Sequence, residues 1–155
     1  MSSPSAERLQ AWRLFFESSL ALTDLLDAEL EDEEGIPMRW YDVLVHLEES
    51  PDGIQMNALA ERILYSKSGL TRVVDRMEEA GLVRRERPPD DRRVVLVHMT
   101  PEGDAALQAS RAVHRDGIRR HFTEHLGAED LARLQGMLEK VRDHVRPLRP
   151  GRVSR

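Results

Sequence analysis

The most chemically distinctive stretch of the chain is RRERPPDDRR, residues 84–93, which places five arginines and three acids around two prolines. Arginine suits an anionic partner, and it fits best in a narrow DNA minor groove, where the potential is most negative. Pro88 and Pro89 restrict the backbone between the cations. Asp90 or Asp91 can pair with a neighbouring arginine and hold the loop in shape. These residue types indicate a stiffened cationic segment that contacts an anion.

The flanks of this stretch place it inside a folded unit. Apolar residues alternate on both sides and predict strands over 82–88 and 93–100, joined by a long loop. Thr100 and Pro101 then begin a helix, with the threonine as its cap. A disordered linker or a processing signal would not lie between two strands of one folded unit. We therefore interpret residues 82–100 as a charged β-hairpin.

The segment before the hairpin, residues 66–82, has the pattern of an amphipathic helix. Leu70, Val73, Val74 and Met77 make up its buried stripe, and Gly81 stands where a helix C-terminal glycine is expected. A recognition helix needs small polar or basic side chains toward its N-terminal end to reach base edges and phosphates. The candidates on the polar side are Ser66, Lys67, Ser68, Thr71, Arg72 and Arg76.

The order of elements favours a winged helix-turn-helix. Helices are predicted over 5–30, 38–50, 56–63, 66–82, 101–126 and 129–146, with the hairpin between the fourth and fifth, and a solvated acidic loop over 31–37. The fold class is mainly α with a small β-hairpin wing. We divide the chain into an N-terminal dimerisation helix and linker (1–37), a DNA-binding domain (38–100), C-terminal dimerisation helices (101–147) and a basic tail (148–155).

Composition excludes several classes of function. The 155 residues suffice for one core, and the absence of cysteine excludes disulfides, thiol redox chemistry and cysteine-ligated metal. We find neither a signal peptide nor a membrane span, which fits a cytoplasmic protein. The net charge of −5 is unevenly distributed, because residues 1–61 carry −11 whereas residues 62–93 and 94–155 carry +3 each. Local anion binding is therefore compatible with an acidic chain.

The terminal helices carry wide apolar faces. Leu9, Trp12, Phe16 and Leu20 recur at helical spacing, and residues 129–146 repeat apolar side chains at heptad spacing. A lone monomer has little reason to carry so much apolar helix at both ends. Packing against a second copy would bury it, so we expect a two-fold homodimer.

The segment LTRVVDRMEEAGLVRRERPPDDRRVVLVHMTPEG resembles the MarR family of bacterial winged helix-turn-helix regulators. The strong part of the resemblance covers residues 56–103. It implies a homodimer that binds double-stranded DNA at a pseudo-palindromic operator, most often as a repressor released by a small phenolic or anionic ligand. Two departures stand out. The segment ILYS (63–66) lacks the small residue common in the helix-turn-helix turn, and the absence of cysteine removes the thiol-based peroxide-sensing branch.

The resemblance also assigns roles within the wing. Arg93 is the expected minor-groove residue and Asp91 its support, while Arg92 is interpreted as a phosphate contact. The three remaining arginines of the hairpin, Arg84, Arg85 and Arg87, are equally well explained as solvated charges, because alternate residues of a strand face opposite ways.

Effector and metal sites are less defined by the sequence. The family resemblance implies a ligand cleft between the dimerisation helices and the DNA-binding lobe, and the candidate lining residues here are Trp12, Phe16, Met38, Arg39, Trp40 and Tyr41. An arginine beside aromatic residues could hold an aromatic carboxylate, although these side chains equally suit core or dimer packing. A zinc-responsive regulator using His114, His121 and His125 is the alternative. No nucleophile–base pair is recognisable, so we expect neither an enzyme nor a cofactor.

Overall fold

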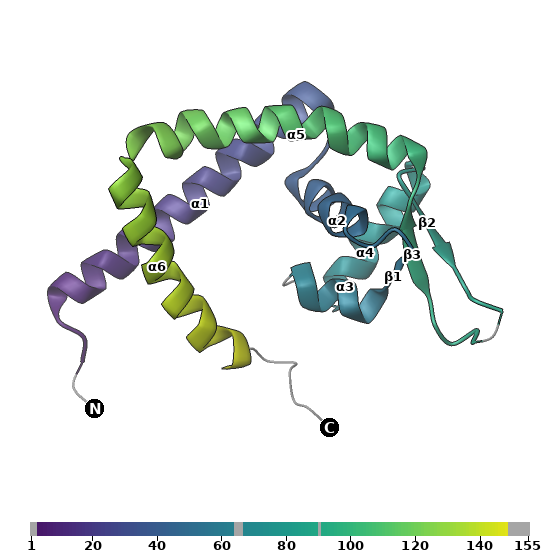
Figure 1. Ribbon diagram of the computed structural model, residues 1–155, viewed down its shortest axis with the longest axis horizontal. Coiled ribbons are helices and arrows are strands. Elements are labelled where there is room, and N and C mark those ends of the chain that lie inside the picture. Colours follow the sequence, from purple (N-terminus) through teal and green to yellow (C-terminus); the bar gives the residue numbers. More distant parts are fainter. Residues whose placement is uncertain (1–2, 64–66, 90, 149–155) are drawn as a thin grey trace. The chain divides into compact units, whose positions relative to one another are not determined.

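The computed structural model describes residues 3–63, 67–89 and 91–148 (Figure 1). The chain forms two compact units, the first ending at Gly117 and the second beginning at Ile118. The α-helices are α1 (Ala6–Glu34), α2 (Met38–Glu48), α3 (Met56–Ile63), α4 (Lys67–Glu79), α5 (Pro101–His121) and α6 (Ala128–Val145). The strands are β1 (Ile54–Gln55), β2 (Val83–Glu86) and β3 (Leu96–Met99), and two short 3₁₀ helices span Thr123–His125 and Arg146–Leu148.

The core of the first unit lies between α2, α3, α4 and the sheet, which gather together in Figure 1. Each helix contributes the apolar residues that recur on one side of it, so that burial follows the 3.6-residue period. The fully buried side chains include Val43, Leu44, Leu59, Leu70, Val74, Met77, Val83 and Val97. This packing holds α4 with its polar side outward and its apolar side against the sheet and the other two helices.

The sheet has three antiparallel strands in the order β1-β3-β2. The hairpin of β2 and β3 confirms the predicted wing, with Val83 opposite Met99 and Arg85 opposite Val97. The third strand was not predicted, because Ile54–Gln55 is too short to show a period of two. It pairs with β3 through Ile54 and Val97, and this pairing leaves β2 as an edge strand.

The prediction of a loop over residues 31–37 is wrong for its first half. Glu31–Glu34 continue α1, which ends only at Gly35, where φ is +66° and the backbone N–H donates to the carbonyl of Glu31. Glycine adopts this left-handed conformation without the steric penalty of a side chain. The acidic run is compatible with the helix because glutamate is a good helix former and all four side chains are exposed.

The predicted cap at Thr100 is confirmed. Its hydroxyl accepts a hydrogen bond from the N–H of Gly103 at 3.0 Å and donates to the carbonyl of Gly81 at 2.7 Å. An acid at 103 would complete a capping box, but a Cβ at Gly103 would collide with the backbone carbonyl of Leu82. The close approach of α5 to the end of α4 explains the glycine.

The second unit begins within the last turns of α5. The prediction of one helix over 101–126 is wrong at its end, because α5 stops at His121 and a 3₁₀ turn spans Thr123–His125 before α6. Within its described residues, α6 has no buried side chain. Among the described helices, none combines the length and apolarity needed to span a bilayer.

Candidate nucleic-acid interface

The outer side of α4 is polar, as the sequence predicts. Leu70, Val74 and Met77 are fully buried, whereas Val73, predicted in the same stripe, is only partly buried. The exposed side chains on the other side are Ser68, Thr71, Arg72, Asp75 and Arg76. Ser66 lies outside the described residues, and so does the side chain of Lys67. The predicted recognition residues that the structure describes therefore share one exposed side of the helix.

The tip of the wing holds its arginine through a local ion pair. The backbone N–H of Arg93 donates to Asp91 Oδ1 at 3.0 Å, and Arg93 Nε lies 3.4 Å from the same oxygen. The turn is closed by the N–H of Val94, which donates to the carbonyl of Asp91. The Arg93 side chain is 94% exposed. The pair expected at Asp91 and Arg93 is therefore present, with the guanidinium open to solvent.

The arginines at the base of the wing differ from one another. Arg84 pairs with Glu86 of its own strand at 2.5 Å, and this contact, more than the charge alone, lowers the pKa of Glu86. Arg85 instead reaches α4, where it pairs with Asp75 and Glu78. Sequence reasoning treated the two arginines alike and missed the role of Arg85. A signal was present, because Val83 and Arg85 share one side of the strand and Val83 is buried.

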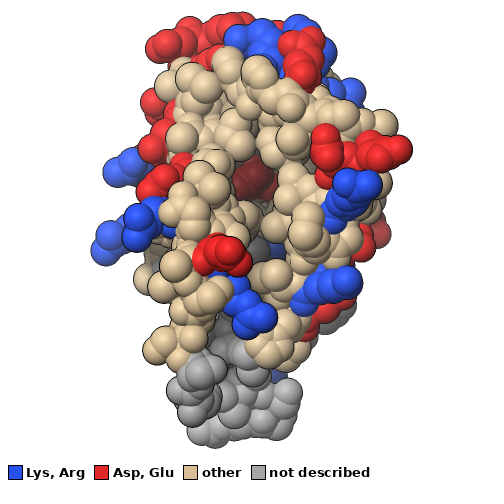
Figure 2. Space-filling view, turned by 90° about the vertical axis from the view of Figure 1, so that its left-hand side faces the viewer, with Lys and Arg blue, Asp and Glu red and all other residues tan. Residues whose placement is uncertain are grey.

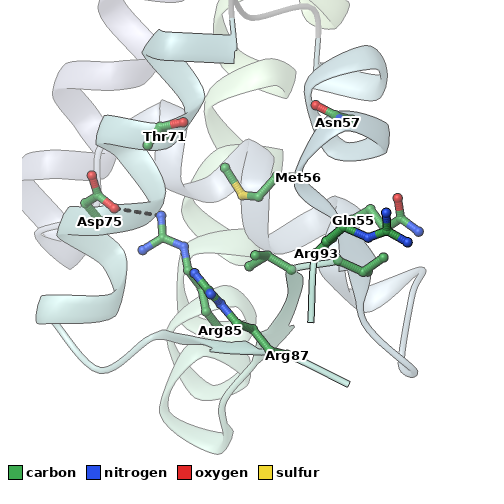
Figure 3. Close-up of a pocket in the computed structure, with 10 residues that line it drawn as sticks. Gln55, Met56, Asn57, Thr71, Asp75, Arg85, Arg87 and Arg93 are labelled. Carbon is green, nitrogen blue, oxygen red and sulfur yellow. Dashed lines mark ion pairs between the residues drawn. The ribbon is translucent and has the colours of Figure 1, made fainter. Parts of the chain in front are cut away.

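A pocket of about 730 Å³ lies between α4, the start of α3 and the wing. Its lining residues are Gln55, Met56, Asn57, Thr71, Asp75, Arg85, Arg87, Arg93, Val94 and Val95. Figure 3 shows the Arg85 guanidinium directed at Asp75 of α4, while Arg93 and Gln55 lie on the opposite side of the pocket. Cationic and neutral polar groups and the carboxylate of Asp75 therefore border one hollow beside α4.

The residues predicted to line an effector pocket occupy different environments. Arg39 and Trp40 border a pocket of about 310 Å³ with Pro37, Gly69, Arg72, Val73 and Arg76. The backbone N–H of Met38 donates to Asp27 Oδ1 at 2.6 Å. Tyr41 is buried, with its ring centroid 4.6 Å from that of His114. Trp12 and Phe16 stack on each other along α1, at 5.8 Å, and do not border this pocket.

The histidines have protein partners rather than a shared centre. His114 packs on Tyr41, and burial lowers its pKa, while the charge of Asp42 acts in the opposite direction. His125 Nε2 lies 2.9 Å from the carbonyl of Arg120. Within the part of the chain that the structure describes, no group of three or more histidines and acids is arranged to hold a metal ion. The geometry therefore gives the zinc alternative no support.

Comparison with known proteins identifies the family. A family model described as MarR family matches residues 34–94. A candidate transcriptional regulatory protein for the hcr operon of Thauera aromatica is 33% identical over 109 residues, which are 70% of this chain and 64% of that protein.

Solved structures extend the likeness over nearly the whole chain. The MarR family regulator AbsC from Streptomyces coelicolor is 35% identical with a TM-score of 0.86, covering 94% of this chain and 99% of its own. The MarR family regulator Sco3205 from the same organism, solved in complex with DNA, is 30% identical with a TM-score of 0.89, covering 97% of this chain and 93% of its own. The chain therefore belongs to the MarR family of DNA-binding transcriptional regulators, which are not enzymes.

Proposed function

We propose that the chain acts as a homodimer that binds a pseudo-palindromic operator, with α4 in the major groove and the wing in the flanking minor groove. The observation that carries this proposal is the exposed Arg93, held by Asp91 on the hairpin that packs beside the polar side of α4. Arginine is favoured in a narrow minor groove, and hydroxyls and arginines at the start of a helix suit base edges and phosphates. The DNA complex of Sco3205 supports the same use of this fold.

The apolar surfaces of the terminal helices support the dimer. On α1, Trp12 is 60% exposed and Phe16 is 48% exposed; on α6, Met137 is 56% exposed. A groove of about 510 Å³ on the second unit is lined by Phe122, Leu131, Leu134, Gln135, Leu138, Glu139 and Arg142. On the face drawn in Figure 2, many of the residues are uncharged (tan), and Lys, Arg, Asp and Glu lie among and around them. Apolar surface of this extent favours association, which agrees with residues 1–37 and 101–147 as dimerisation segments around a DNA-binding domain at 38–100.

We also propose that the regulator is a repressor released by a small aromatic or anionic ligand. The pocket beside Arg39 and Trp40 shares Arg72 and Arg76 with the outer side of α4. A carboxylate held there would compete with DNA for the same guanidinium groups. A thermal-stability screen with small aromatic acids tests this, because a ligand bound to the folded state raises Tm. A ligand that raises Tm without weakening DNA binding would contradict release.

The wing assignment is tested by Arg93→Ala. We expect its affinity for a duplex selected in vitro against the wild-type chain to fall by about 5- to 150-fold, which corresponds to about 1–3 kcal/mol. The measurement is fluorescence anisotropy at fixed salt. Arg84→Ala is the matched control, because Arg84 is paired within its own strand. Equal affinity of Arg93→Ala and the wild type would contradict the minor-groove role.

A further inference from the structure

Arg85 joins the base of the hairpin to α4. Its Nη2 lies 2.7 Å from Asp75 Oδ1, and its Nη1 lies 2.7 Å from Glu78 Oε2. The two acids are three positions apart on α4, so they are neighbours on the helix surface. The planar guanidinium presents its donors as a rigid fork that matches such acceptors. Only 23% of the Arg85 side chain is exposed, against 94% for Arg93.

The backbone of the wing makes a further contact at the same place. The N–H of Arg85 donates to Glu78 Oε1 at 2.8 Å. Because β2 is an edge strand, its outward backbone groups have no neighbouring strand on that side. Glu78 therefore uses both carboxylate oxygens on one wing residue, and the base of the wing is joined to α4 through side chain and backbone together.

Asp75 and Glu78 lie where negative charge would be unfavourable for DNA binding. Asp75 borders the pocket beside the recognition helix, close to where phosphates would approach in the proposed complex. A carboxylate there repels DNA, since affinity for the duplex comes mainly from cations that neutralise phosphates. Acids at such a surface can still favour binding if they hold the wing in a fixed position relative to α4. Holding the wing at one angle to α4 lowers the entropy lost when both elements engage DNA.

We propose that Arg85 is a positioning residue that locks the wing onto α4 through Asp75 and Glu78, so that α4 and Arg93 engage one DNA site together. The inference rests on the proposed roles of α4 and Arg93. In this arrangement Arg85 acts through the placement of Arg93, and the two acids strengthen DNA binding despite their charge.

The sign of the effect at Glu78 separates this lock from a direct phosphate contact by Arg85. If Arg85 contacts phosphate, Glu78→Gln removes a competing negative charge and tightens DNA binding. If Arg85 positions the wing, Glu78→Gln loosens it, and we expect affinity to fall on the order of tenfold. Loss of the Arg93 contact would also lower the log–log salt slope by about 1. Glu79→Gln is the charge-matched control, because Glu79 is the adjacent exposed acid on α4.

A double-mutant cycle adds a second readout. We expect Arg93→Ala to weaken binding in the wild-type background and to have little further effect in an Arg85→Met background, because the unlocked wing no longer places Arg93. Arg84→Met in place of Arg85→Met should leave the effect of Arg93→Ala intact. Each variant is compared at a temperature well below its own Tm, and Glu78→Gln carries the test if Arg85→Met does not fold.

The outcomes are distinct. Weaker binding by Glu78→Gln together with non-additivity between Arg85 and Arg93 supports the lock. Equal or tighter binding by Glu78→Gln, or additive effects of Arg85→Met and Arg93→Ala, overturns the lock and leaves the proposed function standing. If Arg93→Ala binds as tightly as the wild type when Arg85 is intact, the wing assignment fails, and the lock fails with it.

Discussion

The segment around α4 and the terminal helices differ in how much of their apolar surface is buried within the chain. In α4, the apolar stripe of Leu70, Val74 and Met77 is fully buried within the first unit. In α1, the only buried side chain of a 29-residue helix is Leu30, whereas large apolar groups such as Trp12 stay exposed. The described residues of α6 contain none that is buried.

This contrast separates two sources of stability. The packing around α4 is complete within one chain, so its contribution does not require a partner. The terminal helices retain apolar surface that becomes favourable only when something covers it, at about 25 cal/mol for each Å² removed from water. We infer that the segment around α4 is stabilised by its own contacts, whereas the stability of the terminal helices depends on protein concentration.

The largest expected effect comes from placing charges on the exposed apolar side of α1. Trp12→Glu combined with Phe16→Glu should convert the proposed dimer to a monomer, because burying a carboxylate in an apolar interface is costly. A monomer engages one half-site, and loss of the second should weaken operator binding by about 100-fold or more. Light scattering coupled to gel filtration gives the mass, and anisotropy gives the affinity.

Arg13→Glu is the control for this experiment, since it introduces the same group on the same helix at an exposed polar position. We expect it to remain a dimer. A dimeric Trp12→Glu, Phe16→Glu variant with wild-type affinity would remove α1 from the interface.

The next largest effect is a loss of stability from a substitution in the core around α4. Leu70→Ala leaves a cavity beneath α4, because this side chain is fully buried, and it should lower the free energy of unfolding by about 2–5 kcal/mol. Denaturant titration measures the loss, which should be the same at each protein concentration. Thr71→Ala, at the adjacent exposed position, should change stability by less than about 0.5 kcal/mol. If the loss caused by Leu70→Ala varied with protein concentration, it would contradict the view that the core around α4 is stable without a partner.

The sequence predicted those features that depend on neighbouring residues. The buried stripe of α4 and the cap at Thr100 involve positions within a few residues, so spacing identified them. The pair of Asp91 with Arg93 is also local, but the family resemblance was needed to choose Asp91 over Asp90. The end of α1 is an exception. A run of acids and a following glycine resemble a loop, yet Glu31–Glu34 remain helical up to Gly35.

Features that join distant segments were not predictable in the same way. The strand Ile54–Gln55 exists because it pairs with β3, more than 40 residues later. The ion pair between Arg85 and Glu78 of α4 depends on how the hairpin packs against the helix. The order of charges along the sequence does not predict that packing. The candidate ligand residues show the same limit, since Tyr41 packs against His114 while Trp40 borders a pocket with Arg72.

A smaller effect is expected at Thr100, where the core around α4 meets the start of α5. Thr100→Val keeps the shape of the side chain but removes the hydroxyl that bonds Gly103 and Gly81. We expect a loss of about 1–2 kcal/mol in the free energy of unfolding. Thr100→Ser, which retains the hydroxyl, should recover most of it. If valine and serine variants are equally stable, the cap contributes nothing and packing alone holds this junction.

The smallest effect is a pH dependence from the histidine that packs on α2. Burial lowers the pKa of His114 below its ordinary value of 6.5. The unfolded chain therefore binds a proton more readily than the folded one, so the contribution of neutral His114 is complete above about pH 6.5 and declines as the pH falls toward the folded-state pKa.

The variant His114→Gln cannot take up this proton, so its unfolding free energy should change less between pH 7.5 and pH 5.5 than that of the wild type. Glu48 of α2 loses its charge at a lower pH than His114 gains one, because the hydrogen bond from Arg111 lowers the pKa of Glu48 below 4.5. Its contribution is lost only in more acidic solution, which keeps the two groups separable. Parallel pH profiles of the unfolding free energy for the wild type and His114→Gln would mean that His114 is solvated. The contact between α2 and α5 would then not belong to the buried core of the first unit.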